Sequence, residues 1–64
     1  MDKTKAIGIV KAYMDRYDEP SFAEIGMGEY WDSGNYDDAF EYGCEVGRVR
    51  TLIEVFGLTM EDVG

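Results

Sequence analysis

Histidine is absent from this chain of 64 residues, and cysteine and proline each occur once. The lack of histidine removes the commonest general base, the usual catalytic triads and most zinc and iron sites. The single cysteine, Cys44, has no histidine to activate it, and paired carboxylates would need a cleft that so short a chain scarcely forms. The sequence therefore predicts a protein that is not an enzyme.

Loops that hold metal ions or phosphates are missing as well. The segment from Asp32 to Asp37 has glycine and tyrosine at its third and fifth positions, where an EF-hand calcium loop needs oxygen ligands. No glycine-rich phosphate-binding loop occurs. We expect neither a metal nor any other cofactor.

Positive charge is missing from a long central stretch. No Lys or Arg occurs from Tyr17 to Gly47, whereas nine carboxylates do. They are Asp18, Glu19, Glu24, Glu29, Asp32, Asp37, Asp38, Glu41 and Glu45. Seven of the nine aromatic residues lie in the same stretch, so it has the apolar content to fold, unlike a disordered acidic tail.

The charge is therefore distributed unevenly. It is +2 over residues 1–16, −9 over residues 17–47 and −1 over residues 48–64, within a net charge of −8. Such a field repels nucleic acid and anionic membranes and attracts basic protein surfaces. The charge pattern predicts a basic protein as partner, with no direct binding to nucleic acid.

The sequence also predicts neither a leader peptide nor a membrane-spanning segment. The N-terminus lacks the apolar run and cleavage site of a signal peptide, and no apolar run approaches the roughly 20 residues that span a bilayer. A lone cysteine is typical of a reducing compartment. The sequence predicts one small cytoplasmic domain over residues 1–64 that binds no membrane.

Apolar periodicity predicts a first helix over residues 3–17. Asp2 is a suitable N-cap, and apolar residues then recur at spacings of three and four. This stripe consists of Ala6, Ile9, Val10, Tyr13, Met14 and Tyr17. Pro20 ends the helix, because the residue before a proline is pushed out of the α region.

A second helix is predicted over residues 21–32, where Ser21 and Glu24 have the spacing of a capping box. Its inner side would hold Ala23, Met27, Tyr30 and Trp31. Gly26 and Gly28 oppose this helix, since each costs about 1 kcal/mol in a helix interior. An irregular loop or short hairpin is the alternative.

The third helix, over residues 36–56, has the clearest pattern. Its apolar positions form a seam like that of a coiled coil: Ala39, Tyr42, Val46, Val49, Ile53 and Phe56. Ser33 or Asn35 would cap its start. Gly57 suits its C-terminal cap, with Leu58 placed for the apolar contact of a Schellman motif. One further turn is expected over residues 59–62.

The predicted fold is thus a small all-α domain of three helices, the last two forming a hairpin. The run from Gly34 to Ala39, with Tyr30 before it and Val46 after it, resembles the helix–turn–helix of a tetratricopeptide repeat. The resemblance covers residues 21 to about 47 and departs from the family at Gly43, where a large residue is usual. It implies an antiparallel hairpin. It does not imply the peptide groove of the family, because at least about three repeats are needed.

The third helix also carries a row of carboxylates. Asp37, Glu41 and Glu45 stand about 6 Å apart in rise and repel one another, with Arg48 as the nearest cation able to pair with Glu45. In a hairpin, further carboxylates and an aromatic anchor would lie nearby. The candidate partner-binding residues are Glu29, Trp31, Asp32, Asp37, Asp38, Glu41 and Glu45. The simpler alternative is that the carboxylates only keep a small domain soluble.

Small residues form a second row on this helix. Ala39, Gly43 and Gly47 recur every four residues and would let another helix approach closely. That helix would belong either to the same chain or to a second copy in a homodimer.

Two functional hypotheses follow. The first is a non-enzymatic inhibitor that binds a basic nucleic-acid-handling protein. In size and charge the chain resembles the anti-CRISPR and anti-restriction DNA mimics of phages and mobile elements, and that resemblance implies carboxylates in place of phosphates. The second hypothesis is a small helical interaction module or homo-oligomer whose acidity serves only solubility.

Overall fold

The structure, a computed structural model, describes residues 1–32, 34 and 36–64, and that part of the chain is helical with no strand. Two long helices, α1 (Lys3–Tyr17) and α2 (Tyr36–Phe56), are joined through two 3₁₀ helices, η1 (Phe22–Glu24) and η2 (Glu29–Asp32). A short helix, α3 (Met60–Val63), follows. The predicted all-α fold is confirmed, and the predicted helices over 3–17 and 36–56 match α1 and α2.

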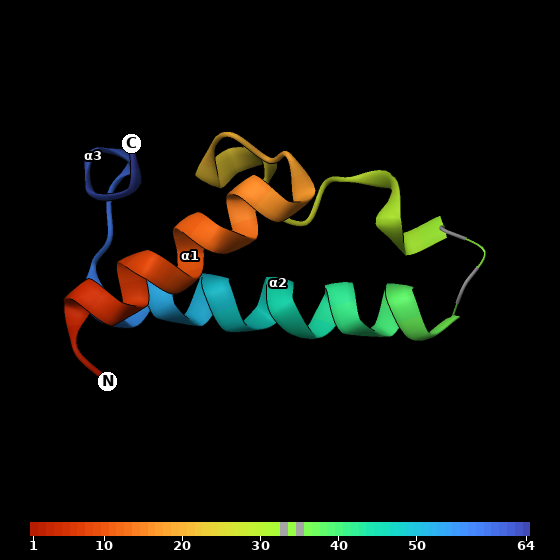
Figure 1. The fold of residues 1–64 in the computed structure, drawn as a ribbon, viewed down its shortest axis with the longest axis horizontal. Helices are drawn as coiled ribbons and strands as arrows, with labels where there is room; N and C mark the ends of the chain where they lie inside the picture. Colours follow the sequence, from red (N-terminus) through yellow and green to blue (C-terminus); the bar gives the residue numbers. More distant parts are fainter. Residues whose placement is uncertain (33, 35) are drawn as a thin grey trace.

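The elements form an elongated body of 34 × 21 × 15 Å. In Figure 1, α1 lies along the second half of α2, η2 lies over the first half, and α3 folds back beside the start of α1. Both termini are at the same end of the body (Figure 1). The other end is formed by η2 and the first turns of α2.

Caps fix both ends of α1, and the N-terminal one, Asp2, is the cap that the sequence predicts. The Asp2 carboxylate accepts the amide N–H of Lys5 at 2.8 Å. At the other end Asp18 adopts a left-handed conformation with φ of 52°, which lets the amide of Glu19 donate to the carbonyl of Met14 at 3.1 Å. This bond is that of a Schellman motif, so α1 ends before Pro20 is reached.

The end of α2 is confirmed in the same detail. Gly57 has a φ of +60°, and the amide of Leu58 donates to the carbonyl of Ile53 at 2.9 Å. Leu58 is buried, and Thr59 and Asp62 form a capping box that starts α3. The Schellman motif and the further turn that the sequence predicts are therefore present.

The core lies between the apolar sides of α1 and α2, closed at its ends by the connecting segment and by α3. Its buried residues are Ala6, Val10, Tyr13, Met14, Tyr17, Ile25, Tyr42, Val46, Val49, Leu58 and Val63. The predicted stripe of α1 and the predicted seam of α2 supply most of them. Ile9 and Ile53 are half-buried against this core.

The predicted helix over residues 21–32 is wrong, and the alternative of an irregular segment is nearer to the structure. Gly26 has a φ of +84°, which no α-helix allows, and it separates η1 from η2. Ile25 is buried here, whereas Met27, expected on the inner side, is 76% exposed. Ser21 bonds the side chain of Glu24 at 2.9 Å and makes no capping bond to the backbone.

The chain still reverses direction before α2, because η2 packs back against that helix. The expected return of the chain is present, but two 3₁₀ helices, η1 and η2, take the place of an α-helix. The first helix of a tetratricopeptide repeat is therefore not formed. Ser33 and Asn35, the predicted turn and cap residues, lie outside the described residues.

Candidate functional site

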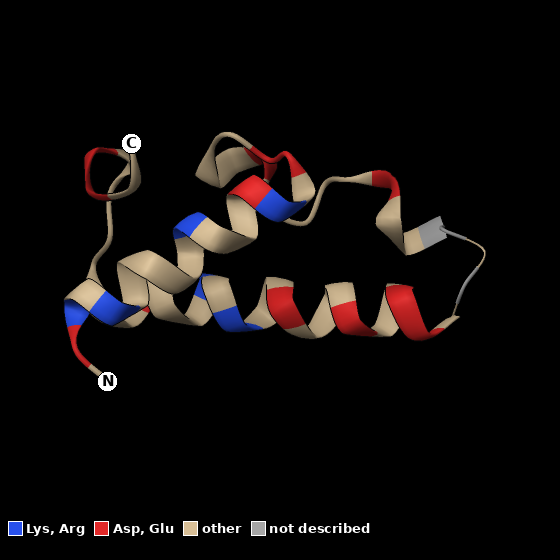
Figure 2. Ribbon diagram, in the orientation of Figure 1, with Lys and Arg blue, Asp and Glu red and all other residues tan. Residues whose placement is uncertain are grey.

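Negative charge gathers at the end of the molecule formed by η2 and the first half of α2. Figure 2 shows acidic residues on successive turns of α2 there, whereas the basic residues lie on α1 and the second half of α2. We call this set the acidic row: Asp37, Asp38, Glu41 and Glu45. Asp37, Asp38 and Glu41 are exposed, and Glu45 is half-buried.

Arg16 is the cation that the fold brings to the acidic row. Its guanidinium lies 3.5 Å from a carboxylate oxygen of Glu41 and 3.4 Å from one of Glu45. The sequence predicts Arg48 as the cation able to pair with Glu45, whereas in the structure Arg16 makes this pair. Arg16 and Glu41 are both well exposed, and exposed ion pairs contribute only about 0–1 kcal/mol. The pairs lower the charge of the row without closing it to other cations.

Glu45 is the most firmly held member of the row. The hydroxyl of Tyr17 donates to its second carboxylate oxygen. Burial and this bond to a carboxylate raise the pKa of Tyr17 to about 12. Glu45 therefore links α2 to α1 and contributes to the fold as well as to the charge of the surface.

The remaining candidates from the sequence lie at the same end. Glu29 is exposed on η2, which packs against α2. The side chain of Asp32 lies outside the described residues. The predicted carboxylates whose side chains the structure describes thus lie at one end of the molecule, with η2 in place of the second half of the predicted helix.

Trp31 is fixed in place and still shows 49% of its surface. Its indole N–H donates to the carbonyl of Gly26 at 2.8 Å, and its ring meets Tyr42 edge-on at 5.0 Å. The ring lies over Gly43, where an added Cβ would be 2.9 Å from the indole. Trp31 is therefore both a packing residue and an exposed aromatic surface.

Two further aromatic residues are exposed on α2. Tyr36 is 81% exposed and Phe40 63% exposed, and their rings stack at 6.4 Å. Tyr36, Phe40 and Gly43 follow one flank of α2 at i, i+4 and i+7, so Trp31 on Gly43 continues the line. We call Trp31, Tyr36 and Phe40 the aromatic stripe. Sequence reasoning did not single out Phe40, because its spacing alone does not show which flank of α2 stays uncovered.

The small residues of α2, Ala39, Gly43 and Gly47, differ in how far other side chains cover them. Gly43 accommodates the ring of Trp31, whereas nothing lies within 4 Å of a Cβ added at Gly47. Ala39 is half-buried. In the neighbouring apolar seam, Tyr42, Val46 and Val49 are buried in the core, and Ile53 and Phe56 pack against it half-buried. One of these small residues, Gly43, therefore packs against an indole within the chain, whereas Gly47 is uncovered.

A buried carboxylate that the sequence analysis missed organises the connecting segment. Glu19 is 4% exposed and accepts the hydroxyls of Tyr13 at 2.5 Å and Tyr42 at 2.6 Å. It also accepts the amide of Gly26 at 3.0 Å. Gly28 approaches so closely that an added Cβ would be 2.8 Å from the carboxylate.

Hydrogen bonds keep Glu19 ionised although it is buried. Burial alone would raise its pKa, but the bonds from Tyr13, Tyr42, Gly26 and Gly28 together lower the pKa below its ordinary value. The signal in the sequence was the pair of tyrosines at predicted core positions, because a buried hydroxyl needs a partner. Glu19 is enclosed by these groups, so this site is a structural centre.

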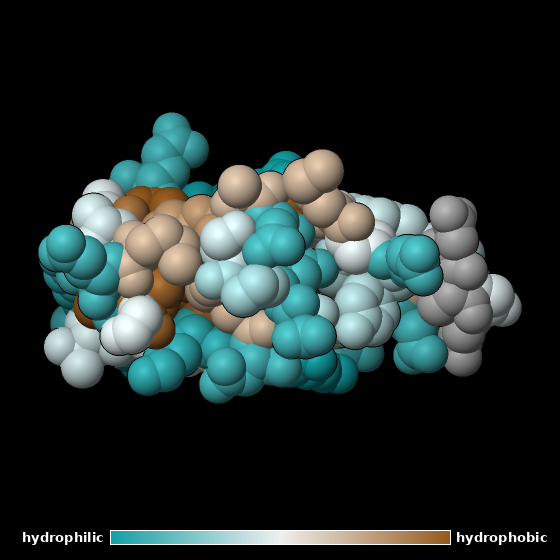
Figure 3. All heavy atoms as spheres, turned by 90° about the horizontal axis from the view of Figure 1, so that it is seen from above, coloured by the Kyte–Doolittle hydropathy of each residue, from teal (hydrophilic) through white to brown (hydrophobic). Residues whose placement is uncertain are grey.

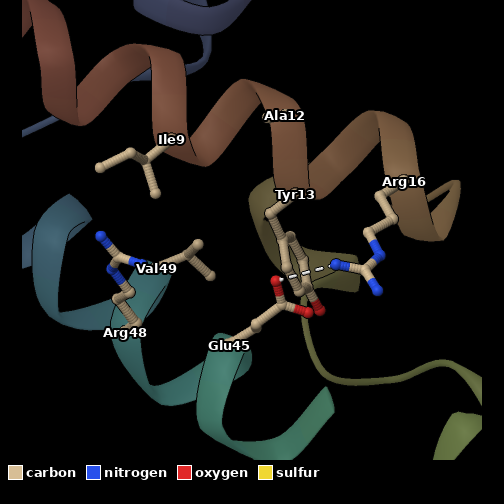
Figure 4. Close-up of a pocket in the computed structure, with 7 residues that line it drawn as sticks. All are labelled: Ile9, Ala12, Tyr13, Arg16, Glu45, Arg48 and Val49. Atoms are coloured by element: carbon tan, nitrogen blue, oxygen red, sulfur yellow. Dashed lines mark hydrogen bonds and ion pairs between the residues drawn. The ribbon is translucent and has the colours of Figure 1, made fainter. Parts of the chain in front are cut away.

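A cleft of about 210 Å³ lies between α1 and α2 (Figure 4). Ile9, Ala12 and Val49 supply its apolar lining. The ion pair of Arg16 and Glu45 stands at one side and Arg48 at the other (Figure 4). The cleft is smaller than the roughly 300 Å³ at which ligand pockets begin, and the charges on one side already match each other.

The hydropathy of the surface also differs between the two ends of the molecule. On the face shown in Figure 3, strongly hydrophobic colour is confined to the half that carries the start of α1.

Among the described residues no group of three or more His, Cys, Asp or Glu is arranged to hold a metal. None of the helices described is long and apolar enough to cross a membrane.

Comparison of the chain with protein-family models, with curated proteins and with solved structures finds no match. The proposals below therefore rest on the geometry and charge of the acidic end.

Proposed function

We propose that this chain is a non-enzymatic modulator that occupies the nucleic-acid-binding surface of a basic protein, in the manner of anti-CRISPR or anti-restriction DNA mimics. The acidic row supports this most. From Asp37 to Glu45 it places four carboxylates in about 12 Å of helix, at 1.5 Å per residue. One strand of DNA presents a phosphate about every 3.4 Å along its axis. Both arrays offer Lys and Arg a closely spaced line of negative charge.

The exposure of the row also supports binding. Asp37, Asp38 and Glu41 are exposed, and the pairs with Arg16 are weak enough for a cation of the partner to replace Arg16. The free thiol of Cys44 is exposed, which agrees with a reducing compartment such as the cytoplasm.

The alternative, a homodimer built on the third helix, has less support. The apolar seam already packs within the chain, with three of its six residues buried and the others half-buried, and Gly43 is covered by Trp31. Of the three residues of the small-residue row, only Gly47 is exposed. Monomer behaviour of wild type and of Gly47→Leu in sedimentation at high concentration would dispose of this alternative.

The test is capture of basic proteins from a cell lysate on immobilised protein at low salt, followed by elution with duplex DNA. We expect DNA to displace a discrete basic protein, and retention to fall steeply with added salt. The double variant Asp37→Lys/Glu41→Lys should lose this protein. Glu45 is left unchanged because it holds Tyr17.

The matched control is Glu54→Lys/Glu61→Lys, which changes the same charge at exposed positions outside the acidic row. Equal loss in both variants would mean that net charge alone acts. Retention that survives the Asp37→Lys/Glu41→Lys change would refute the proposal.

A further inference from the structure

The aromatic stripe exposes more apolar surface than the fold requires. Tyr36 and Phe40 contact each other and are 81% and 63% exposed, so they contribute little to the core. Trp31 is anchored by Tyr42 and by the carbonyl of Gly26, yet 49% of it faces solvent. Contiguous exposed apolar surface on a small protein marks an interaction site. Aromatic residues are also the commonest anchors of such sites.

Negative charge borders this stripe along α2. Asp37 precedes Phe40 by three residues, one turn away on the helix, and Glu41 follows it directly. On the connecting segment, Glu29 comes two residues before Trp31. A group that lies on the stripe therefore meets carboxylates at its edge. Aromatic rings bordered by carboxylates favour the binding of a flat cation over that of an apolar side chain.

Resting on the function proposed above, we infer that the aromatic stripe binds arginine in preference to lysine. The basic partner places Arg side chains on Trp31, Tyr36 and Phe40. A guanidinium is planar and weakly hydrated, so it stacks on an aromatic face while its edge bonds a carboxylate in two places. An ammonium is compact and strongly hydrated and does neither as well.

The space beside Trp31 suits such a guest. Gly47 follows Gly43, on which Trp31 lies, by one turn, and nothing occupies the volume where its Cβ would be. The space over Gly47 is open, so the stem of an incoming Arg can pass along α2 one turn from Gly43, on which Trp31 lies.

The experiment compares nona-arginine with nona-lysine, two peptides of equal charge, by isothermal titration at about 150 mM salt. Trp31 is the only tryptophan of the chain, so its emission reports contact with the peptide directly. We expect tighter binding of nona-arginine and a larger change in Trp31 emission. In Tyr36→Ser/Phe40→Ser the preference should fall by about two- to fivefold, the worth of a cation over an exposed ring. The affinity of this double variant for nona-lysine should equal that of wild type.

Val55→Ser is the control, because Val55 is 69% exposed on the second half of α2. It should leave the preference unchanged. A preference that survives in Tyr36→Ser/Phe40→Ser would overturn the inference. If Asp37→Lys/Glu41→Lys still weakens the binding of both peptides in that case, the acidic row binds cations without a preference for arginine. Failure of wild type to bind either peptide overturns both proposals.

Discussion

The hydroxyl of Tyr42 donates to the carboxylate of Glu19 at 2.6 Å, although 23 residues separate the two in the chain. The same hydroxyl accepts the amide N–H of Gly28 at 3.1 Å. Through these bonds α2 holds the end of α1 and the segment between η1 and η2 in one arrangement. That segment precedes Trp31 and η2, so the buried carboxylate positions part of the proposed binding surface.

The substitution Glu19→Gln should lower the free energy of unfolding by about 1–3 kcal/mol, the cost of leaving a buried polar group without its partner. The new amide would set N–H donors against Tyr42, whose oxygen already accepts from Gly28. Urea denaturation followed by circular dichroism measures the change. Glu54→Gln, at an exposed position, is the control and should change stability by less than about 0.5 kcal/mol. Equal stability of both variants would contradict the structural part assigned to Glu19.

The contribution of Glu19 should also depend on pH. Because its pKa in the folded protein is lowered from the ordinary 4.5, its ionised form stabilises the fold above that pH. The contribution is lost as the pH falls through the lowered pKa. The difference in unfolding free energy between wild type and Glu19→Gln should therefore be constant above about pH 5 and shrink in more acidic solution. A difference that stays constant down to about pH 2 would show that the charge of Glu19 is immaterial.

The long helices could be predicted from the sequence, because their apolar spacing and caps are local. Asp2 and Gly57 act at the ends that the pattern indicates. The segment over 21–32 could not, because its path depends on Gly26 in a left-handed conformation and on the burial of Ile25 against distant residues. Propensity and spacing carry no information about such contacts.

In the candidate site too, local spacing could be predicted from the sequence and long-range contacts could not. The positions of Glu41 and Glu45 on one side of α2 follow from helical spacing alone. Their pairing with Arg16 does not, since it depends on how α1 crosses α2. The exposure of Phe40 likewise depends on which flank of α2 the other elements leave uncovered.

Two glycines of α2 should respond oppositely to alanine. Gly47→Ala should raise the free energy of unfolding by up to about 1 kcal/mol, because alanine favours the helix and its Cβ meets nothing within 4 Å. Gly43→Ala should lack this gain, because its Cβ would be 2.9 Å from the ring of Trp31. Urea denaturation gives both values, and the emission of Trp31 should change in Gly43→Ala alone. An equal gain in both variants would mean that Trp31 does not pack on Gly43.

Arg16→Gln should separate stability from binding. The pairs with Glu41 and Glu45 are exposed at Arg16, so their loss should cost less than about 1 kcal/mol in urea denaturation. The acidic row, however, loses the cation nearest to it. Association with nona-lysine should become faster, and its rate should fall more steeply with added salt.

Lys11→Gln provides the comparison, because it removes the same charge from an exposed position of α1 that makes no ion pair in the described part of the chain. Stopped-flow measurements at low and moderate salt distinguish local from overall charge. If Arg16→Gln accelerates association more than Lys11→Gln, the acidic row is the surface that the cation approaches. Equal rates in the two variants would mean that the peptide responds only to net charge, and the acidic row would then have no special part in binding.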